Sequence, residues 1–295
     1  MIAASTIGVK TRFIVNPRSG ASLGKLPSVR EFATRHGASM VFTERSRHAS
    51  KLAEQALADG CELVVAVGGD GTMNEIASVL AGSASTLGLV PCGSGDGLGR
   101  FLGVHGPVGR ALEILLSGVP RLIDSGLADG HPFFSMAGLG FEAEIARKFN
   151  QLQHRGFLRY VTTSIAAWRQ WRPSEYVVTY SGGRDAFRAF TVAIANSNQY
   201  GNNARIAPHA LIDDGELDLC AVPPLNVFNV LPLATQLFGG SLANGVITRR
   251  ADEFVIERKS SGPLHTDGET HEAGKVIRVT VRPASLRILV PRTNE

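Results

Sequence analysis

Val64–Leu80 reads VVAVGGDGTMNEIASVL, an apolar run followed by three glycines and one carboxylate at positions 68–71. The apolar run predicts a buried strand, and the residues from Thr72 onward have a helical pattern. Backbone N–H groups at the start of a helix can bind an anion, and glycine lets a ligand approach the main chain closely. The stretch therefore predicts a strand–turn–helix unit with an anion-binding turn at Gly68, Gly69 and Gly71.

The same order of strand and helix recurs through the first part of the chain. Strand-like segments end in turns that are rich in glycine, hydroxyl and carboxylate residues: NPRSG (16–20), FTE (42–44), GGDGT (68–72) and PCGSGDG (91–97). Helical patterns follow, the first from about Pro27 to His36. This alternation predicts a doubly wound, mainly parallel α/β sheet, which binds ligands at the carboxyl ends of its strands.

The pattern changes after about Leu122, where β-branched and alternating segments separated by Asp-Gly and Gly-Gly turns predict strands and hairpins. We expect an α/β domain over residues 1–123 and a β-rich domain over 124–282. The second domain carries a helical insertion near Phe141–Trp171. Residues 283–295 are expected to return to the first domain.

Composition restricts the class of protein. Of 295 residues, 44% are apolar and 19% are charged, which is typical of a soluble globular chain. The formal net charge of +4 is too small to indicate a nucleic-acid partner. Three dispersed cysteines imply no disulfide framework, and the N-terminal residues lack the pattern of a secretory signal. We therefore expect a cytoplasmic protein, with no apolar run of the roughly 20 residues that span a bilayer.

The glycine-rich segments of the first domain do not fit two common phosphate-binding motifs. GASLGKLP (20–27) has three residues between its glycines, and leucine follows its lysine, so it is not a P-loop. GSGDGLG (93–99) misses the dinucleotide fingerprint. Asp70 would repel phosphate if it stood alone, so it suggests a cation that accompanies a nucleotide, usually Mg²⁺. The alternative is a plain Asp-Gly turn in which Asp70 caps the helix that starts near Thr72.

Five segments together resemble a known family. They are NPRSG (16–20), GGDGTMNE (68–75), GLVPCGSGDGLGRFLG (88–103), NSNQYGNNARIAPHALIDDGELDL (196–219) and HTDGE (265–269). Their order and spacing resemble the diacylglycerol kinase and sphingosine kinase superfamily, in its bacterial soluble lipid kinase form. The resemblance implies an α/β domain like those of NAD kinase and diacylglycerol kinase, a C-terminal β-sandwich, and an active site in the cleft between them.

The family also implies roles for individual residues. The expected nucleotide-binding residues are Asn16, Thr43, Gly68, Gly69, Asp70, Gly71, Thr72, Asn74 and Ser94. Asp214 resembles a carboxylate ligand of a structural Mg²⁺, beside the backbone carbonyls of Leu211 and Glu216. Glu269 aligns with the proposed general base, and Asp70 joins it as a catalytic residue. A carboxylate in reach of a lipid hydroxyl can accept its proton during phosphoryl transfer.

Simpler interpretations stay open for the same segments. IDDGELD (212–218) could be a hairpin with a solvated acidic tip, and TDGE (266–269) a tight surface turn. His265 and His271 are expected at the surface, since no third ligand at suitable spacing suggests zinc. The aromatic residues of the second domain could line an acyl pocket or form ordinary core: Phe133, Phe134, Phe141, Trp168 and Trp171.

One departure from the family pattern concerns the second glycine loop. Relatives usually have asparagine where this chain has Asp96, so a carboxylate lies beside the expected phosphates. Either Asp96 pairs with Arg100 or another cation, or it weakens nucleotide binding.

The sequence thus predicts an ATP-dependent lipid kinase that uses ATP and Mg²⁺. Its substrate would be a lipid hydroxyl, reached by transient contact with the membrane surface, and a homodimer paired through strand edges stays open. One alternative is a kinase of a soluble acceptor such as NAD, although the residues after GGDGT favour the lipid kinases. The other is a nucleotide-binding protein of the same fold without turnover.

Overall fold

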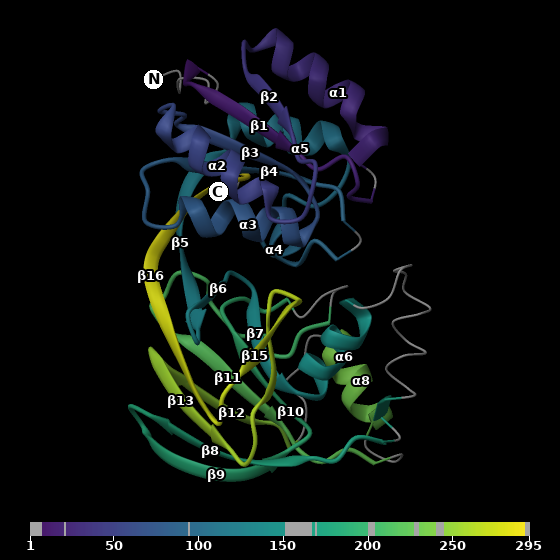
Figure 1. Ribbon diagram of the computed structural model, residues 1–295, viewed down its shortest axis with the longest axis vertical. Helices are drawn as coiled ribbons and strands as arrows, with labels where there is room; N and C mark the ends of the chain where they lie inside the picture. Colours follow the sequence, from purple (N-terminus) through teal and green to yellow (C-terminus); the bar gives the residue numbers. More distant parts are fainter. Residues whose placement is uncertain are drawn as a thin grey trace. The chain divides into compact units, whose positions relative to one another are not determined.

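The structure is a computed structural model that describes residues 8–20, 22–93, 95–150, 167–168, 170–199, 204–226, 230–239 and 245–292. The chain forms two compact units (Figure 1). Unit 1 contains the chain up to Asp124 and again from Ala284. Unit 2 begins at Ser125 and ends at Pro283.

Unit 1 is built on a parallel sheet with the strand order β2-β1-β3-β4. Its strands are β1 (Thr11–Val15), β2 (Ser39–Phe42), β3 (Leu63–Gly68) and β4 (Thr86–Pro91). Four longer helices pack in two pairs, α1 (Ser22–Arg35) with α5 (Val108–Ser117) and α2 (His48–Ala58) with α3 (Asp70–Leu80). Every residue of β3 is buried, as expected for a strand covered by helices on both faces. The predicted doubly wound α/β fold is confirmed.

Unit 2 is a sandwich of antiparallel strands. One sheet has the order β12-β11-β10-β7-β14-β15. Its strands are β7 (Met136–Gly140), β10 (Thr191–Ala195), β11 (Leu217–Val222), β12 (Ile247–Ala251), β14 (Gly262–Thr266) and β15 (Glu269–Ala273). The facing strands are β5 (Val119–Ala128), β6 (His131–Phe133), β8 (Ser174–Tyr180), β9 (Gly183–Ala189), β13 (Glu253–Arg258) and β16 (Val276–Val290).

The core of unit 2 takes apolar side chains from both sheets. Leu139, Ile194 and Leu264 come from the six-stranded sheet, and Phe254 and Ile277 come from the facing strands. All five are fully buried. This shared core confirms the predicted C-terminal β-sandwich.

Local turn chemistry sets the registers of three hairpins in unit 2. Asp129-Gly130 joins β5 to β6 and Asp267-Gly268 joins β14 to β15, and all four residues have positive φ angles between 49° and 85°. Such angles at both central positions are typical of the type I′ turn, whose twist suits a hairpin. Ser181-Gly182 joins β8 to β9. The predicted Asp-Gly turn and the hairpin at Gly182-Gly183 are confirmed.

The expected helical insertion and C-terminal return can be followed only in part. The insertion begins with α6 (Phe141–Asn150), which packs on β7, β14 and β15, and residues 151–166 lie outside the described part. A second helix of this unit is α8 (Val230–Gly239). The C-terminal part of β16 belongs to unit 1, where Arg287 and Ile288 pair in parallel with β4. No described helix has the length and apolar character needed to cross a membrane.

Candidate active site

Close approach of a second glycine-rich loop shapes the turn between β3 and α3. β3 ends at Gly68, Gly69 has an extended backbone, and α3 begins at the next residue. A Cβ atom at Gly69 would lie 3.3 Å from the Cα atom of Gly93, which follows β4. In the opposite direction, a Cβ atom at Gly93 would lie 3.0 Å from the Cα atom of Gly69. This contact within the protein already favours glycine at both positions, before any ligand is considered.

Asp70 binds the second loop through both of its carboxylate oxygens. Oδ2 accepts the N–H of Asp96 at 3.0 Å, and Oδ1 accepts the N–H of Gly97 at 2.9 Å. Gly97 opens the short helix α4 (Gly97–Phe101), so Asp70 caps α4 and not α3. The alternative reading of the turn, in which Asp70 caps its own helix, is therefore wrong. A contact between Asp70 and a metal-bound nucleotide stays a prediction.

Asp96 finds a partner that the sequence did not identify. Its side chain is 2% exposed, and its Oδ1 accepts the N–H of Gly93 at 3.1 Å. Its Oδ2 lies 3.3 Å from Nδ1 of His105. Arg100, the expected partner, instead donates its Nε–H to the carbonyl of Gly95 at 2.8 Å. The cation nearest to Asp96 by sequence thus supports the loop backbone.

The electrostatics of this pair favour its neutral form. Burial, followed by the negative charge of Asp70, raises the pKa of Asp96 to about 7. Burial and the positive charges of Arg100 and Lys25 lower the pKa of His105. The Asp96 carboxyl group is therefore neutral below about pH 7, and the lowered pKa of His105 keeps its imidazole neutral to a lower pH than usual, so Asp96 resembles an uncharged asparagine.

Asn16 links the end of β1 to the start of α3. Its Nδ2 donates to Oγ1 of Thr72 at 2.9 Å, and its Oδ1 accepts the N–H of Arg18 at 3.0 Å. Thr72 is 5% exposed. Two of the predicted nucleotide-binding residues therefore lie together, beside Gly68.

The remaining predicted nucleotide contacts are distributed differently. Thr43 is buried and donates its N–H to the carbonyl of Val15 at 2.8 Å, which ties the end of β2 to β1. Gly71 and Asn74 lie in the first turns of α3. Ser94 lies outside the described residues. Its predicted contact with ATP is therefore left as a prediction.

Two polar residues near these loops have roles that the sequence analysis missed. Nζ of Lys25 donates to the carbonyl of Pro91 at 2.5 Å, which places a cation at the end of β4. The carboxylate of Glu75 accepts the N–H groups of Ala49 (2.9 Å) and Ser50 (3.3 Å) and so caps α2. Lys25 lies in the segment GASLGKLP (20–27), which does not match the P-loop pattern. The pattern therefore gives no reason to expect this lysine near the glycine loops.

In unit 2, the predicted base Glu269 follows a well-anchored turn. Asp267 accepts the N–H groups of Phe134 at 2.8 Å and of Ser135 and Met136 at 2.9 Å each. Glu269 is half-buried and opens β15. The turn is tight, as the simpler interpretation expected, but Asp267 fastens it to β7. The role of Glu269 as general base stays a prediction.

The expectation of surface histidines is wrong for His265. This residue is 6% exposed, and its Nε2 lies 3.4 Å from Oε1 of Glu142, which is also buried. A Cβ atom at Gly138 would lie 2.6 Å from this Nε2, so glycine makes room for the pair. His271 is only partly exposed, stacks on His131 at 3.6 Å and pairs with Thr266 through its ring nitrogen.

An arginine pairs with the carboxylate that was predicted to bind Mg²⁺. Arg250 forms an ion pair with Asp214 and another with Glu216, the latter at 3.0 Å, while Asp214 also accepts the N–H of Glu216. Leu211, whose carbonyl was the third predicted ligand, is 53% exposed. Within the described ranges no group of three or more His, Cys, Asp or Glu residues is arranged to hold a metal. Arg250 competes with a cation for the Asp214 carboxylate, and binding of Mg²⁺ by Asp214 with the backbone carbonyls of Leu211 and Glu216 stays a prediction.

The aromatic residues of unit 2 divide between fully buried and partly buried positions. Phe133 and Phe134 are at most 1% exposed. Phe141 contacts Phe190 at a ring distance of 4.4 Å and Trp171 at 5.8 Å. The interpretation as core is therefore confirmed for Phe133 and Phe134, and an acyl pocket lined by the partly buried aromatic residues stays a prediction.

Comparisons with known proteins agree with both halves of the fold. Residues 10–128 match the family model of the diacylglycerol kinase catalytic domain, and residues 135–290 match that of the YegS C-terminal NAD kinase beta sandwich-like domain. Over 271 residues the chain is 28% identical to a diacylglycerol kinase of Bacillus subtilis (strain 168), covering 88% of this chain and 89% of that protein.

Two further similarities were found. A Pseudomonas aeruginosa (strain UCBPP-PA14) protein named "Probable lipid kinase YegS-like" is 30% identical over 250 residues, which is 82% of this chain and 81% of that protein. The crystal structure of a diacylglycerol kinase from Bacillus anthracis strain Sterne has a TM-score of 0.72, with 20% identity, over 95% of this chain and 96% of that one. At this identity the structural match shows the shared fold alone.

The matched regions confirm the resemblance that the five motifs indicated. They cover both units, and the second alone spans more than half of the chain. They favour a phosphotransferase with an alcohol acceptor and give no support to a kinase of a soluble acceptor. The chain belongs to the diacylglycerol kinase family of lipid kinases, in its YegS-like branch.

Proposed function

We propose that this lipid kinase transfers the γ-phosphate of ATP to the hydroxyl group of diacylglycerol or a closely related lipid. The observation that carries the proposal is the pair of hydrogen bonds that the Asp70 carboxylate accepts from the backbone N–H groups of Asp96 and Gly97. It joins two glycine-rich loops at the carboxyl ends of β3 and β4, where parallel sheets bind ligands.

The start of α3 supplies the donors for the phosphate chain. The first N–H groups of a helix have no acceptor within the helix, and the helix dipole favours a negative charge there. In α3 these groups belong to Asp70, Gly71 and Thr72, next to Gly69. Asn16 holds the side chain of Thr72 in place. Phosphate oxygens bound here would replace water at groups that the fold already orients.

Glu269 would act as the general base. Its carboxylate would accept the proton of the lipid hydroxyl while the hydroxyl oxygen bonds to the γ-phosphorus and ADP leaves. A base of this kind contributes about 10²–10⁴ in rate. Mg²⁺ would accompany ATP and neutralise phosphate charge when bound.

A lipid panel tests the reaction. The protein is incubated with γ-labelled ATP and mixed micelles that contain diacylglycerol, monoacylglycerol, sphingosine or phosphatidylglycerol, with NAD as the soluble acceptor. We expect label in one lipid product and none in NADP. Label in NADP alone would refute the proposal, and so would ATP binding without any product.

The base assignment is tested in a matched pair of variants. Glu269→Gln removes the carboxylate but keeps the size of the side chain, and Glu272→Gln makes the same change at an exposed position of the same strand. We expect kcat to fall about 10²–10⁴-fold in Glu269→Gln, with ATP affinity unchanged, and to stay near normal in Glu272→Gln. Equal activity of the two variants would remove Glu269 from the role.

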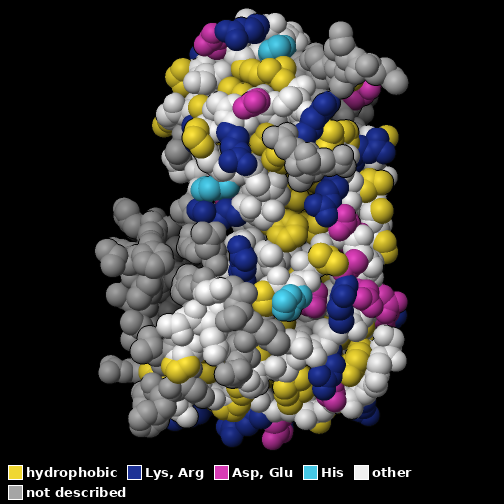
Figure 2. Space-filling model, turned by 180° about the vertical axis from the view of Figure 1, so that it is seen from behind, with side chains coloured by type: hydrophobic (Ala, Val, Ile, Leu, Met, Phe, Trp, Pro, Cys, Tyr) yellow, Lys and Arg dark blue, Asp and Glu magenta, His cyan; other side chains and the backbone are white. Residues whose placement is uncertain are grey.

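Access to a lipid requires transient contact of this cytoplasmic protein with the membrane surface. Lys and Arg side chains are interspersed with acidic and apolar ones among the described residues of the face in Figure 2. This mixture suits weak, reversible attraction to anionic lipid better than a nucleic-acid surface. Co-sedimentation should rise with the anionic lipid content of vesicles, and identical sedimentation with neutral vesicles would contradict it. Light scattering would test whether two copies pair.

A further inference from the structure

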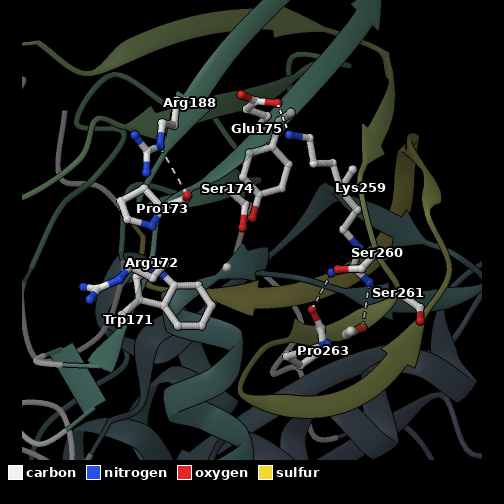
Figure 3. Close-up of a pocket in the computed structure, with 14 residues that line it drawn as sticks. Trp171, Arg172, Pro173, Ser174, Glu175, Arg188, Lys259, Ser260, Ser261 and Pro263 are labelled. Atoms are coloured by element: carbon white, nitrogen blue, oxygen red, sulfur yellow. Dashed lines mark hydrogen bonds and ion pairs between the residues drawn. The ribbon is translucent and has the colours of Figure 1, made fainter.

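A cavity of about 440 Å³ lies in unit 2, apart from every residue assigned above to ATP or to catalysis. Its walls are Trp171–Tyr176, Arg188 of β9, and Arg258–Pro263 between β13 and β14, with Gly140 at its edge. Figure 3 shows Arg172 and Arg188 on one side and Lys259 and Ser260 on the other. The volume is within the usual range for small-molecule sites.

Basic side chains outnumber acidic ones in this cavity. Four cations line it, Arg172, Arg188, Arg258 and Lys259, and Glu175 is the only carboxylate among the described lining residues. Nζ of Lys259 lies 2.7 Å from Oε2 of Glu175, so these two charges offset each other. Three positive charges remain.

Arg258 is held in place by the backbone. Its Nε–H donates to the carbonyl of Gly274 at 3.0 Å, and its Nη1 donates to the carbonyl of Pro263 at 3.1 Å. Its Nη2 donates to the carbonyls of Gly262 (2.6 Å) and Ala273 (2.7 Å). All of these acceptors are neutral. The fold therefore places a half-buried positive charge at the cavity wall, and no carboxylate of a described residue forms an ion pair with it.

Arg172 and Arg188 are the cations with donors to spare. Both are exposed, and Arg188 donates its Nε–H to the carbonyl of Pro173 at 3.3 Å. No other hydrogen bond or ion pair to a described residue engages either guanidinium. That bond turns Arg188 toward the wall that carries Arg172 (Figure 3). Their free N–H groups are the kind that bind phosphate oxygens in pairs.

The uncharged groups of the cavity suit the rest of a phosphate ester. Ser260 and Ser261 present exposed hydroxyl groups that can donate to phosphate oxygens. The ring of Trp171 lines the opposite wall, while its N–H is already donated to the carbonyl of Phe190 at 3.0 Å. Apolar contact is therefore what this ring offers to a ligand.

We propose that this cavity is a second, non-catalytic site that binds the phosphate group of a small phosphate ester through Arg172 and Arg188. The ester could be free in solution or the headgroup of an anionic lipid, since both carry the same group. The site does not depend on the proposed kinase reaction. It would let the protein respond to a phosphorylated metabolite or lipid while the glycine loops hold ATP.

Binding is measured without nucleotide, so that its outcome is independent of turnover. One arm titrates inorganic phosphate and glycerol 3-phosphate by calorimetry, and the other measures co-sedimentation with vesicles of phosphatidylcholine with or without phosphatidic acid. The test variant is the double substitution Arg172→Gln/Arg188→Gln. Arg184→Gln is the matched control, because Arg184 lies on the same strand as Arg188, pairs with Glu257 at 3.1 Å and does not line the cavity.

We expect affinity to fall about 10- to 100-fold in the double variant and to stay unchanged in Arg184→Gln. Glu175→Gln removes the carboxylate and should strengthen binding several-fold, a gain that misfolding would not give. If the double variant loses affinity for the soluble phosphate compounds, the site binds a free ester. If it loses affinity for vesicles with phosphatidic acid, the site binds a lipid headgroup. No binding in either arm, or equal binding by the double variant and the wild-type protein, would overturn the proposal.

Discussion

Replacing Asp96 by asparagine should stabilise the protein by an amount that increases with pH. Asp96 is 2% exposed, and its Oδ1 accepts the N–H of Gly93, a bond that an amide oxygen keeps. Its backbone is left-handed, with φ at 46°, a conformation that asparagine also adopts. The substitution therefore preserves the shape of the loop and removes the ability of the side chain to ionise.

The size of the effect follows from the pKa of Asp96. Folding raises that pKa from 3.8 to about 7, so the folded state keeps a proton that the unfolded state has lost. Stability therefore falls as pH rises from about 4 to about 7 and is constant above that. At 1.36 kcal/mol for each pH unit, the free energy of unfolding decreases by about 4 kcal/mol over the whole range. About 2–3 kcal/mol of this falls between pH 5 and pH 8.

The measurement compares the wild-type protein with Asp96→Asn across that pH range. Urea unfolding is followed by hydrogen–deuterium exchange in peptides from β3 and β4, which report on unit 1 alone. The difference between the two proteins removes the contributions of groups that do not contact Asp96. Glu54→Gln, an exposed change in α2, controls for the loss of one negative charge.

The free energy of unfolding of Asp96→Asn relative to the wild-type protein should increase by about 2–3 kcal/mol between pH 5 and pH 8. The same difference for Glu54→Gln should stay nearly constant. Parallel curves for the wild-type protein and Asp96→Asn would show that the buried carboxyl group ionises without penalty. The explanation of its burial by a neutral pair with His105 would then be wrong.

Three further substitutions test contacts that the fold requires, each by thermal unfolding, where 1 kcal/mol shifts the midpoint by about 2–4 °C in units of this size. Gly93→Ala places a methyl group 3.0 Å from the Cα atom of Gly69, so we expect a loss of about 1–3 kcal/mol. Gly138→Ala would overlap Oε1 of Glu142, and a loss of about 3 kcal/mol or more is expected. Asp267→Ala leaves three N–H groups without their acceptor and should cost about 3 kcal/mol or more, with Asp267→Asn losing less. An unchanged midpoint in any of the three would contradict the corresponding contact.

Features set by neighbouring residues could be predicted from the sequence. The strand that ends at Gly68 and the turn at Asp129-Gly130 depend on local hydrophobic pattern and on backbone angles that glycine and aspartate tolerate. Pro27 shows where a local rule misled. Proline favours the first turn of a helix, which suggested a start there, but α1 begins at Ser22 and contains Pro27. Helix boundaries depend on packing as well as on propensity.

The partners of polar side chains could not be predicted, because the fold brings them from distant positions. Asp70 meets a loop 26 residues further along the chain, and Arg250 reaches Asp214 across 36 residues. The glycine turn suggested a metal partner for Asp70, and the family resemblance implied one for Asp214. The family match identified the loops that matter, whereas their mutual contacts required the structure.

Those contacts change the physical account of the glycine turn. A bare carboxylate at Asp70 would oppose a triphosphate, which is why the sequence suggested a metal cation. In the fold, the charge of Asp70 faces two N–H dipoles at the start of α4, and this reduces the field that it exerts on the turn. Asp96 loses its charge below about pH 7 by taking up a proton. Because hydrogen bonds offset the charge of Asp70 and protonation removes that of Asp96, the backbone N–H groups of α3 can attract phosphate even before a metal binds.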